Sequence, residues 1–280
     1  MRPVDIGALL ILFGVLAASL LGAFGGEKDV QRGPGEKRRP MPTGPALPDP
    51  SPRDPVIQIQ GGGPKKNSIG TAFSLDSDGI WMTARHVVDG CKTVGIERRS
   101  GEAVRVRKIW IHPDADLAIL SDTLRTPALE IAERLPTVGE TGFGVGYPQG
   151  IPAEVTGTLI GRAVSVALHR NERAEPVLTW AESRRYPDFE GTLGGISGGP
   201  LFVSEGRVAG VVISGSPRRG RFNTAAPRSF PAAIAAAQLT PDRRDRYFTF
   251  PDYIDETSID GLGDALRNAG AVALVYCLVE

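Results

Sequence analysis

Short apolar or alternating runs follow one another along the chain from Val56 onward, and turn residues separate them. Helical periodicity is scarce after the first thirty residues. The breaks are rich in Gly, Asp, Pro and Ser, as in Asp76–Gly79, Ser100–Glu102 and Ser204–Gly206. Many short strands at this spacing are typical of an all-β sandwich or barrel. We expect strands within VIQIQ, GTAFSL, IWMTARHVV, TVGIE, AVRVRKIWI, LAIL, TGFGVGY, EVTGTLIG, PVLTWAE, PLFVS and VAGVVIS.

The beginning of the chain has a different pattern. Residues 6–26 form an uncharged, mostly apolar run, which is long enough to cross a bilayer as a helix. We expect a transmembrane anchor there; a cleaved signal peptide is the alternative, because Ala23-Phe24-Gly25 offers a small-x-small cleavage site. Residues 27–55 are rich in proline and charge, and we expect them to form an extended linker.

The charges around this run leave its orientation ambiguous. Several Lys and Arg residues follow the run, and a literal count of positive charges would leave the next domain in the cytoplasm. Long downstream domains, however, translocate largely regardless of charge. Because the start of the chain is similar to a secretory signal, we favour export.

The end of the chain combines helical and strand-like segments. PAAIAAAQL, which starts at Pro231, has the alanine content of a helix packed on the domain. A further helix is expected around Ser258 to Ala269, followed by a strand-like AVALVYCLV. We therefore expect a folded domain over residues 56–240 and an extension over 241–280, whose role the sequence leaves open.

Composition and cysteine usage narrow the classes of function. Lys plus Arg (32) equals Asp plus Glu (32), so the chain lacks the basic footprint of a nucleic-acid-binding protein. Cys91 and Cys277 are the two cysteines, which excludes metal sites built from Cys-x-x-Cys pairs. We expect neither a metal nor an organic cofactor. The two cysteines could form one disulfide in an oxidising compartment, or remain two separate buried thiols.

Three local motifs carry chemistry. They centre on His86, on the pair Asp114 and Asp116, and on Ser197. Each alone is more typical of a turn or of a structural residue, but they occur in the order histidine, aspartate, serine within one β-rich domain. A serine hydroxyl needs a base to become a good nucleophile, and an imidazole oriented by a carboxylate can act as that base.

The motifs together resemble those of the trypsin-like serine peptidases. The resemblance rests on Gly70-Thr71-Ala72-Phe73 leading to Thr83-Ala84-Arg85-His86-Val87, on Asp116-Leu117-Ala118-Ile119-Leu120, and on Gly195-Ile196-Ser197-Gly198-Gly199-Pro200-Leu201. It extends over residues 56–235 and is strongest for the bacterial Deg/Htr-like branch, here expected without a PDZ domain. It implies two six-stranded antiparallel β-barrels with a C-terminal helix, preceded in this chain by the transmembrane helix.

The resemblance also implies roles for individual residues. Ser197 would be the nucleophile, His86 the general base and acid, and Asp116 the orienting carboxylate. The backbone N–H groups of Gly195 and Ser197 would form the oxyanion hole. Asp114 competes for the carboxylate role, and we prefer Asp116 because the apolar run Leu117–Leu120 follows it directly.

Two histidines lie outside these motifs. His112 and His169 have no motif support, and we expect them to be surface or structural residues.

The same resemblance suggests where a substrate would bind. Ile213, Ser214 and Gly215 would pair with an extended substrate backbone. Gly191 would lie at the base of the specificity pocket and residues 224–226 on its opposite wall, which predicts an uncharged pocket. Glu190 lies one position away; if it stood at the base of the pocket instead of Gly191, the pocket would carry a negative charge.

The expected function is that of a serine endopeptidase, acting on a protein or peptide through an acyl-enzyme. The alternative is a catalytically silent double-barrel binding module at the membrane. An esterase is a third reading, but a hydrolase elbow places the histidine last in chain order. The expected location is the bacterial inner membrane, single-pass, with the peptidase domain in the periplasm, or a secreted or soluble periplasmic form.

Overall fold

The computed structural model describes residues 44–60, 65–98, 101–168, 174–238 and 246–280. These residues belong to one compact unit, Pro40–Glu280. The expected membrane segment 6–26 and residues 27–43 of the expected linker lie outside the described residues. Within the described ranges, no helix combines the length and apolar character needed to span a membrane.

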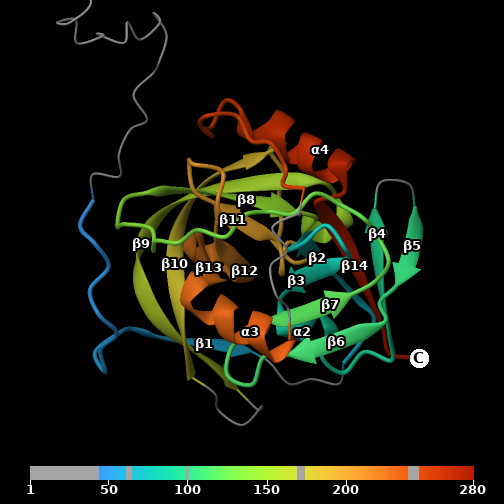
Figure 1. Ribbon diagram of the computed structural model, residues 1–280. Coiled ribbons are helices and arrows are strands. Elements are labelled where there is room, and N and C mark those ends of the chain that lie inside the picture. Colours follow the sequence, from blue (N-terminus) through green and yellow to red (C-terminus); the bar gives the residue numbers. More distant parts are fainter. Residues whose placement is uncertain (1–43, 61–64, 99–100, 169–173, 239–245) are drawn as a thin grey trace, which may run out of the picture. The chain divides into compact units, whose positions relative to one another are not determined.

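The strands form two sheets that lie side by side (Figure 1). Six strands of one sheet close on themselves in the order β9-β10-β13-β12-β11-β8, because β8 also pairs with β9. We call this the closed barrel. Its strands are β8 (Thr141–Gly146), β9 (Ala153–Leu168), β10 (Ala174–Tyr186), β11 (Pro200–Phe202), β12 (Val208–Ser216) and β13 (Arg221–Ala225).

The second sheet has the strand order β5-β4-β14-β2-β3-β7-β6 and stays open, and we call it the open sheet. Its strands are β2 (Ser68–Ser74), β3 (Ile80–Thr83), β4 (Thr93–Arg98), β5 (Glu102–Arg105), β6 (Lys108–Ile111), β7 (Ala118–Ser121) and β14 (Val272–Leu278).

The fold therefore differs from two six-stranded barrels. The run AVRVRKIWI, expected as one strand, bends at Val106 and Arg107 and supplies both edges of the open sheet. The Val106 N–H donates to Val94 O (2.9 Å) on one edge, and the Arg107 N–H donates to Ser121 O (2.7 Å) on the other. Among the described residues β5 and β6 do not pair with each other, so the sheet is a half-barrel rather than a closed one.

The last strand lies in the middle of the open sheet. β14 pairs antiparallel with β2 on one side and with β4 on the other. Val272, Ala273 and Val275 of this strand are fully buried. Cys277 of β14 forms a disulfide with Cys91, so these cysteines are not separate thiols. Residues after 240, whose role the sequence left open, thus supply a central part of the domain.

The segment before the first strand lies against the closed barrel. Val138 N donates to Pro45 O (3.1 Å), Arg162 Nη1 donates to Pro48 O (2.5 Å), and Leu47 packs against the barrel core. β1 (Val56–Gln60) then pairs in parallel with β9, which adds one parallel pair to an otherwise antiparallel arrangement.

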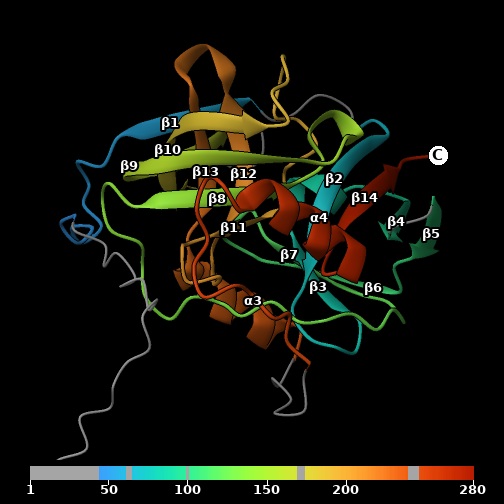
Figure 2. The same ribbon diagram turned by 90° about the horizontal axis from the view of Figure 1, so that it is seen from above.

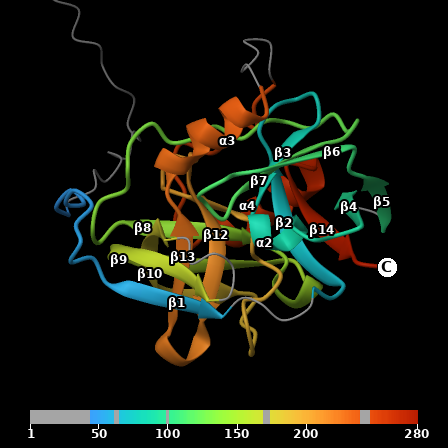
Figure 3. The same ribbon diagram turned by 90° about the horizontal axis from the view of Figure 1, so that it is seen from below.

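Helices pack against strands of both sheets. The expected helices are found as α3 (Phe230–Ala236) and α4 (Ile259–Ala269), and α4 ends at Gly270, whose φ of 76° is left-handed. Figure 2 shows α4 over the place where β8 and β14 approach one another. A short helix, α2 (Arg85–Val88), follows β3 and lies beside β2 at the boundary between the sheets (Figure 3). Single turns occur at Pro148–Gly150, Pro217–Arg219 and Pro227–Ser229.

Candidate active site

His86 and Asp116 come together at the boundary between the two sheets. His86 lies on α2, and Asp116 lies in the loop between β6 and β7. Asp116 Oδ2 is 2.6 Å from His86 Nδ1, and Asp116 Oδ1 accepts the backbone N–H of His86 at 2.8 Å. The imidazole is 47% exposed and the carboxylate 19%, so the ring reaches solvent while its partner is largely covered. One carboxylate thus bonds both the ring and the backbone of His86, which orients the ring relative to its own helix.

The charges of the pair shift both pKa values. Burial alone would lower the pKa of His86, but the charge and hydrogen bond of Asp116 outweigh burial and raise it above its usual 6.5. Burial opposes the ionised form of Asp116, but the charge and hydrogen bonds of His86 hold the pKa of Asp116 below its usual range. The pair therefore favours an ionised carboxylate next to an imidazole with raised proton affinity.

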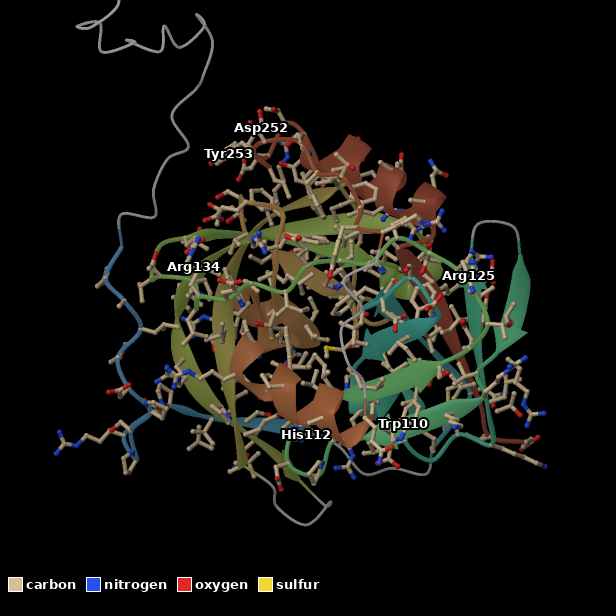
Figure 4. The ribbon with its side chains drawn as sticks, in the orientation of Figure 1. Trp110, His112, Arg125, Arg134, Asp252 and Tyr253 are labelled. Carbon is tan, nitrogen blue, oxygen red and sulfur yellow. A yellow bond between two sulfur atoms is a disulfide. The ribbon has the colours of Figure 1, made fainter. Side chains whose placement is uncertain are left out.

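His112 organises the loop that carries Asp116. Its buried Nδ1 accepts the backbone N–H groups of Asp114 (2.9 Å) and Ala115 (2.8 Å), so this nitrogen carries no proton. Figure 4 labels His112 where β6 ends. Burial lowers the pKa of His112, which favours the neutral acceptor form. The expectation of a structural role is met, although the residue is buried rather than at the surface; His169 lies outside the described residues.

The competing carboxylate, Asp114, is exposed. Its backbone contacts His112 and not His86, whereas Asp116 makes both bonds to His86. The geometry therefore pairs Asp116, and not Asp114, with the imidazole.

The loop that contains Ser197 packs closely against the segment that leads to His86. Thr71 N donates to Ser197 O at 2.8 Å. A Cβ added to Gly198, whose φ is +89°, would lie 2.0 Å from Thr71 O and 2.9 Å from the backbone nitrogen of Ala84, two residues before His86. Among the described residues, no hydrogen bond joins Ser197 Oγ to His86. Backbone packing is thus what brings the serine loop and the histidine segment together.

The backbone N–H groups of Gly195 and Ser197 point away from the residues that bind the carbonyl oxygens of the same peptide units. Gly194 O accepts from Gln149 N (2.5 Å), and Ile196 O accepts from Gly199 N (2.8 Å). In a trans peptide the N–H points opposite to the C=O, so the N–H groups of Gly195 and Ser197 face away from these donors. Within the described part of the chain, neither N–H donates to a protein acceptor. These are the two groups from which the sequence predicted an oxyanion hole.

The end of β12 offers an open strand edge near the serine loop. β11 pairs with β12 only as far as Val211, and Val212 then exchanges two hydrogen bonds with residues 198 and 199. Ile213 is buried, whereas Gly215 is exposed. Asn223, which the sequence analysis did not single out, donates from Nδ2 to Ser214 Oγ at 3.0 Å.

Gly191 lies beside Arg185 and Gln149. Its carbonyl accepts from Arg185 Nη1 at 2.9 Å, and a Cβ built on it would lie 2.9 Å from Gln149 Nε2. Leu193 is the residue of this segment that approaches Gly215, with 3.5 Å between its Cβ and a Cβ built there. Leu193 is buried and Glu190 exposed, so an apolar side chain lies beside the strand edge.

Glu175 is a further charged residue of this region, and sequence reasoning missed it. It lies on β10 and is 8% exposed, and its Oε2 accepts the backbone N–H of Asp116 at 2.7 Å. Nothing in its local sequence signals this contact, because the two residues are 59 positions apart.

No group of three or more His, Cys, Asp or Glu side chains in the described ranges is arranged to hold a metal ion. A pocket of about 1080 Å³ lies elsewhere, and His86, Asp116 and Ser197 do not line it. Its walls include Leu47, Arg134 and Phe230.

Comparison with known proteins identifies the family. The model of the trypsin-like peptidase domain matches residues 70–211, half of the chain. A Synechocystis protein named as a serine protease, HhoB, is 30% identical over 53% of this chain and 35% of its own length. A Halomonas elongata protein named as a DegP-like periplasmic serine endoprotease is 29% identical over 54% of this chain and 30% of its own length. The chain thus spans about a third of the length of these relatives.

A solved structure shares the fold. The active form of the Rv3671c protease of Mycobacterium tuberculosis superposes with a TM-score of 0.50 at 23% identity, covering 73% of this chain and 100% of that one. At this identity the likeness concerns the fold alone. Together with the family match over the His86, Asp116 and Ser197 motifs, these findings show that the chain belongs to the trypsin-like peptidase family, with relatives among the bacterial DegP-like serine proteases.

Proposed function

We propose that this protein is a serine endopeptidase in which Ser197 is the nucleophile, His86 the general base and acid, and Asp116 the orienting carboxylate. The observation that carries the proposal is the pair of hydrogen bonds between Asp116 and His86, next to a serine loop that packs on the same segment. Family membership supports it, since trypsin-like domains are peptidases by name.

The proposed reaction proceeds through an acyl-enzyme. Ser197 Oγ attacks the scissile carbonyl while His86 Nε2 takes its proton, and Asp116 stabilises the imidazolium that forms. The carbonyl oxygen becomes an oxyanion and accepts from the N–H groups of Gly195 and Ser197. His86 then protonates the leaving amine, and water repeats the sequence to release the acid and restore Ser197.

The substrate class follows from the open edge of β12. An extended peptide can pair with Ile213, Ser214 and Gly215, because β11 covers this strand only as far as Val211. Leu193 beside Gly215, together with the absence of a charge at Gly191, favours an uncharged residue before the scissile bond. The partner of this protein is thus a protein or peptide in extended conformation.

We also propose a location in the bacterial envelope, with residues 6–26 as the membrane anchor and the peptidase domain in the periplasm. The apolar run is long enough to span a bilayer. A disulfide between Cys91 and Cys277 is typical of an oxidising compartment. DegP-like relatives are named as periplasmic.

The decisive experiment compares the protein with Ser197→Ala. The unchanged protein should be labelled by a fluorophosphonate probe and hydrolyse a denatured protein substrate. Ser197→Ala should lose labelling and at least about 10³-fold in kcat, with its circular dichroism unchanged. If the unchanged protein is folded but takes up no probe and cleaves nothing, the silent binding module is the better description. If Ser197→Ala keeps normal turnover, the nucleophile is another residue.

A further inference from the structure

Glu175 connects the closed barrel to the loop that carries Asp116. It lies on β10, opposite Ser165 of β9, and belongs to the closed barrel. The N–H of Asp116, between β6 and β7 of the open sheet, donates to Glu175 Oε2 at 2.7 Å. A hydrogen bond to a charged acceptor is short and about twice as strong as a neutral one. This bond therefore fixes the Asp116 backbone relative to the other sheet.

The same carboxyl group adds a second negative charge beside the imidazole. Burial, and next the charge of Asp116, raise the pKa of Glu175 to about 7, although the Asp116 N–H, His86 and Arg85 all oppose the shift. The ionised form of Glu175 in turn helps to raise the pKa of His86, whereas Lys65 lowers it. Among the described residues, no Lys or Arg forms an ion pair with Glu175. Its charge acts on His86 and Asp116.

We propose that Glu175 is a positioning residue of the peptidase, which holds the Asp116 loop across the two sheets and sets the negative charge that His86 experiences. The proposal rests on the proposed function of His86 as the general base. It gives Glu175 two separable effects. The acceptor oxygen places Asp116, and the charge decides at which pH His86 gives up its proton.

Two substitutions separate these effects. Glu175→Gln keeps an oxygen that can accept the Asp116 N–H but removes the charge. Glu175→Ala removes both. A merely structural role would lower the stability of both variants. It would leave the pH profile of kcat/KM of the molecules that remain folded unchanged.

The first measurement is the pH profile of kcat/KM. Activity requires neutral His86, and its pKa is raised above 6.5; activity of the unchanged enzyme is therefore lost as pH falls through a midpoint above 6.5. In Glu175→Gln this midpoint should move to lower pH by about 0.5 to 1 unit, with kcat on the plateau within about threefold. In Glu175→Ala the plateau kcat should fall by about tenfold or more, because the loop loses its anchor.

The profile of the unchanged enzyme should also be broader than that of a single group. Glu175, whose pKa is raised to about 7, interacts with His86, so the apparent pKa values belong to the pair. Glu175→Gln should reduce the acid limb to a one-proton curve. Glu130→Gln is the matched control, because it removes the same charge from a side chain that is 43% exposed and pairs with Arg207. Its midpoint should stay within about 0.1 unit of the unchanged enzyme.

A second measurement does not depend on turnover. NMR titration of the imidazole Cε1–H signals, with the His86 signal assigned by its loss in a His86→Asn variant, reports the pKa of His86 directly. A lower pKa of His86 in Glu175→Gln than in Glu130→Gln supports the proposal even if no peptide is cleaved, so that the proposed function can fail separately. Equal values of this pKa in the two folded variants overturn the proposal.

Discussion

Replacing Gly198 by alanine tests the packing that brings the serine loop to the histidine. Gly198 follows Ser197 and has a φ of +89°, in the left-handed region. An added Cβ would lie 2.0 Å from Thr71 O, 2.2 Å from Thr83 Oγ1 and 2.9 Å from Ala84 N. Two of these atoms belong to the backbone and cannot turn away. Gly198→Ala must therefore displace the loop or the strands beneath it.

Two contributions determine the size of the effect. An L-residue in the left-handed region costs about 1–2 kcal/mol. Restoring an ordinary contact with Thr71 O requires a retreat of about 1.4 Å from the 2.0 Å approach, and overpacking of this kind costs about 1–3 kcal/mol. The free energy of unfolding should thus fall by about 2–5 kcal/mol. A shift of about 1 Å at a reacting group can cost about 10²-fold in rate, so kcat/KM should fall at least that far.

Gly139→Ala is the control. Gly139 has nearly the same φ, +87°, but nothing lies within 4 Å of a Cβ added to it. The free energy of unfolding of Gly139→Ala should fall only by about 1–2 kcal/mol, the cost of an L-residue at this φ, and its activity should be kept. Urea unfolding followed by tryptophan fluorescence measures the first quantity, and hydrolysis of a peptide ester or amide the second. If the two variants lose the same free energy of unfolding and keep the same kcat/KM, packing at Gly198 does not position Ser197.

Two further predictions concern the carboxylate and the location. Asp116→Asn should lower kcat by about 10⁴-fold, whereas Asp114→Asn should stay within about threefold, because Asp114 is exposed and makes no bond to His86; the reverse ranking in steady-state assays would give the orienting role to Asp114. The intact protein should remain with membranes through a high-salt wash and keep its initial residues, and added protease should reach the domain after Val56 in spheroplasts. Protection until the inner membrane is opened would place the domain in the cytoplasm.

The sequence by itself determined the features that depend on neighbouring residues. Strand runs such as Thr141–Gly146 could be predicted because alternation and turn residues act within a few positions. The helix expected around Ser258 to Ala269 is found at Ile259–Ala269, and Gly270 ends it. The motifs around His86, Asp116 and Ser197 were visible because each reactive residue has a characteristic local setting.

Only the tertiary structure decided what depends on residues far apart in the chain. An apolar run such as Val272–Leu278 predicts a strand but not its partners, and pairing with both β2 and β4 was settled by where the chain returns. The bend at Val106 and Arg107 places the two halves of one apolar run on opposite edges of the open sheet. It depends on the hydrogen bonds that these residues donate to Val94 and Ser121. The contact between Glu175 and Asp116 was also decided by the tertiary structure. A buried hydrogen bond between residues 59 positions apart depends on how the two sheets pack, and neither segment carries a sequence pattern that predicts it.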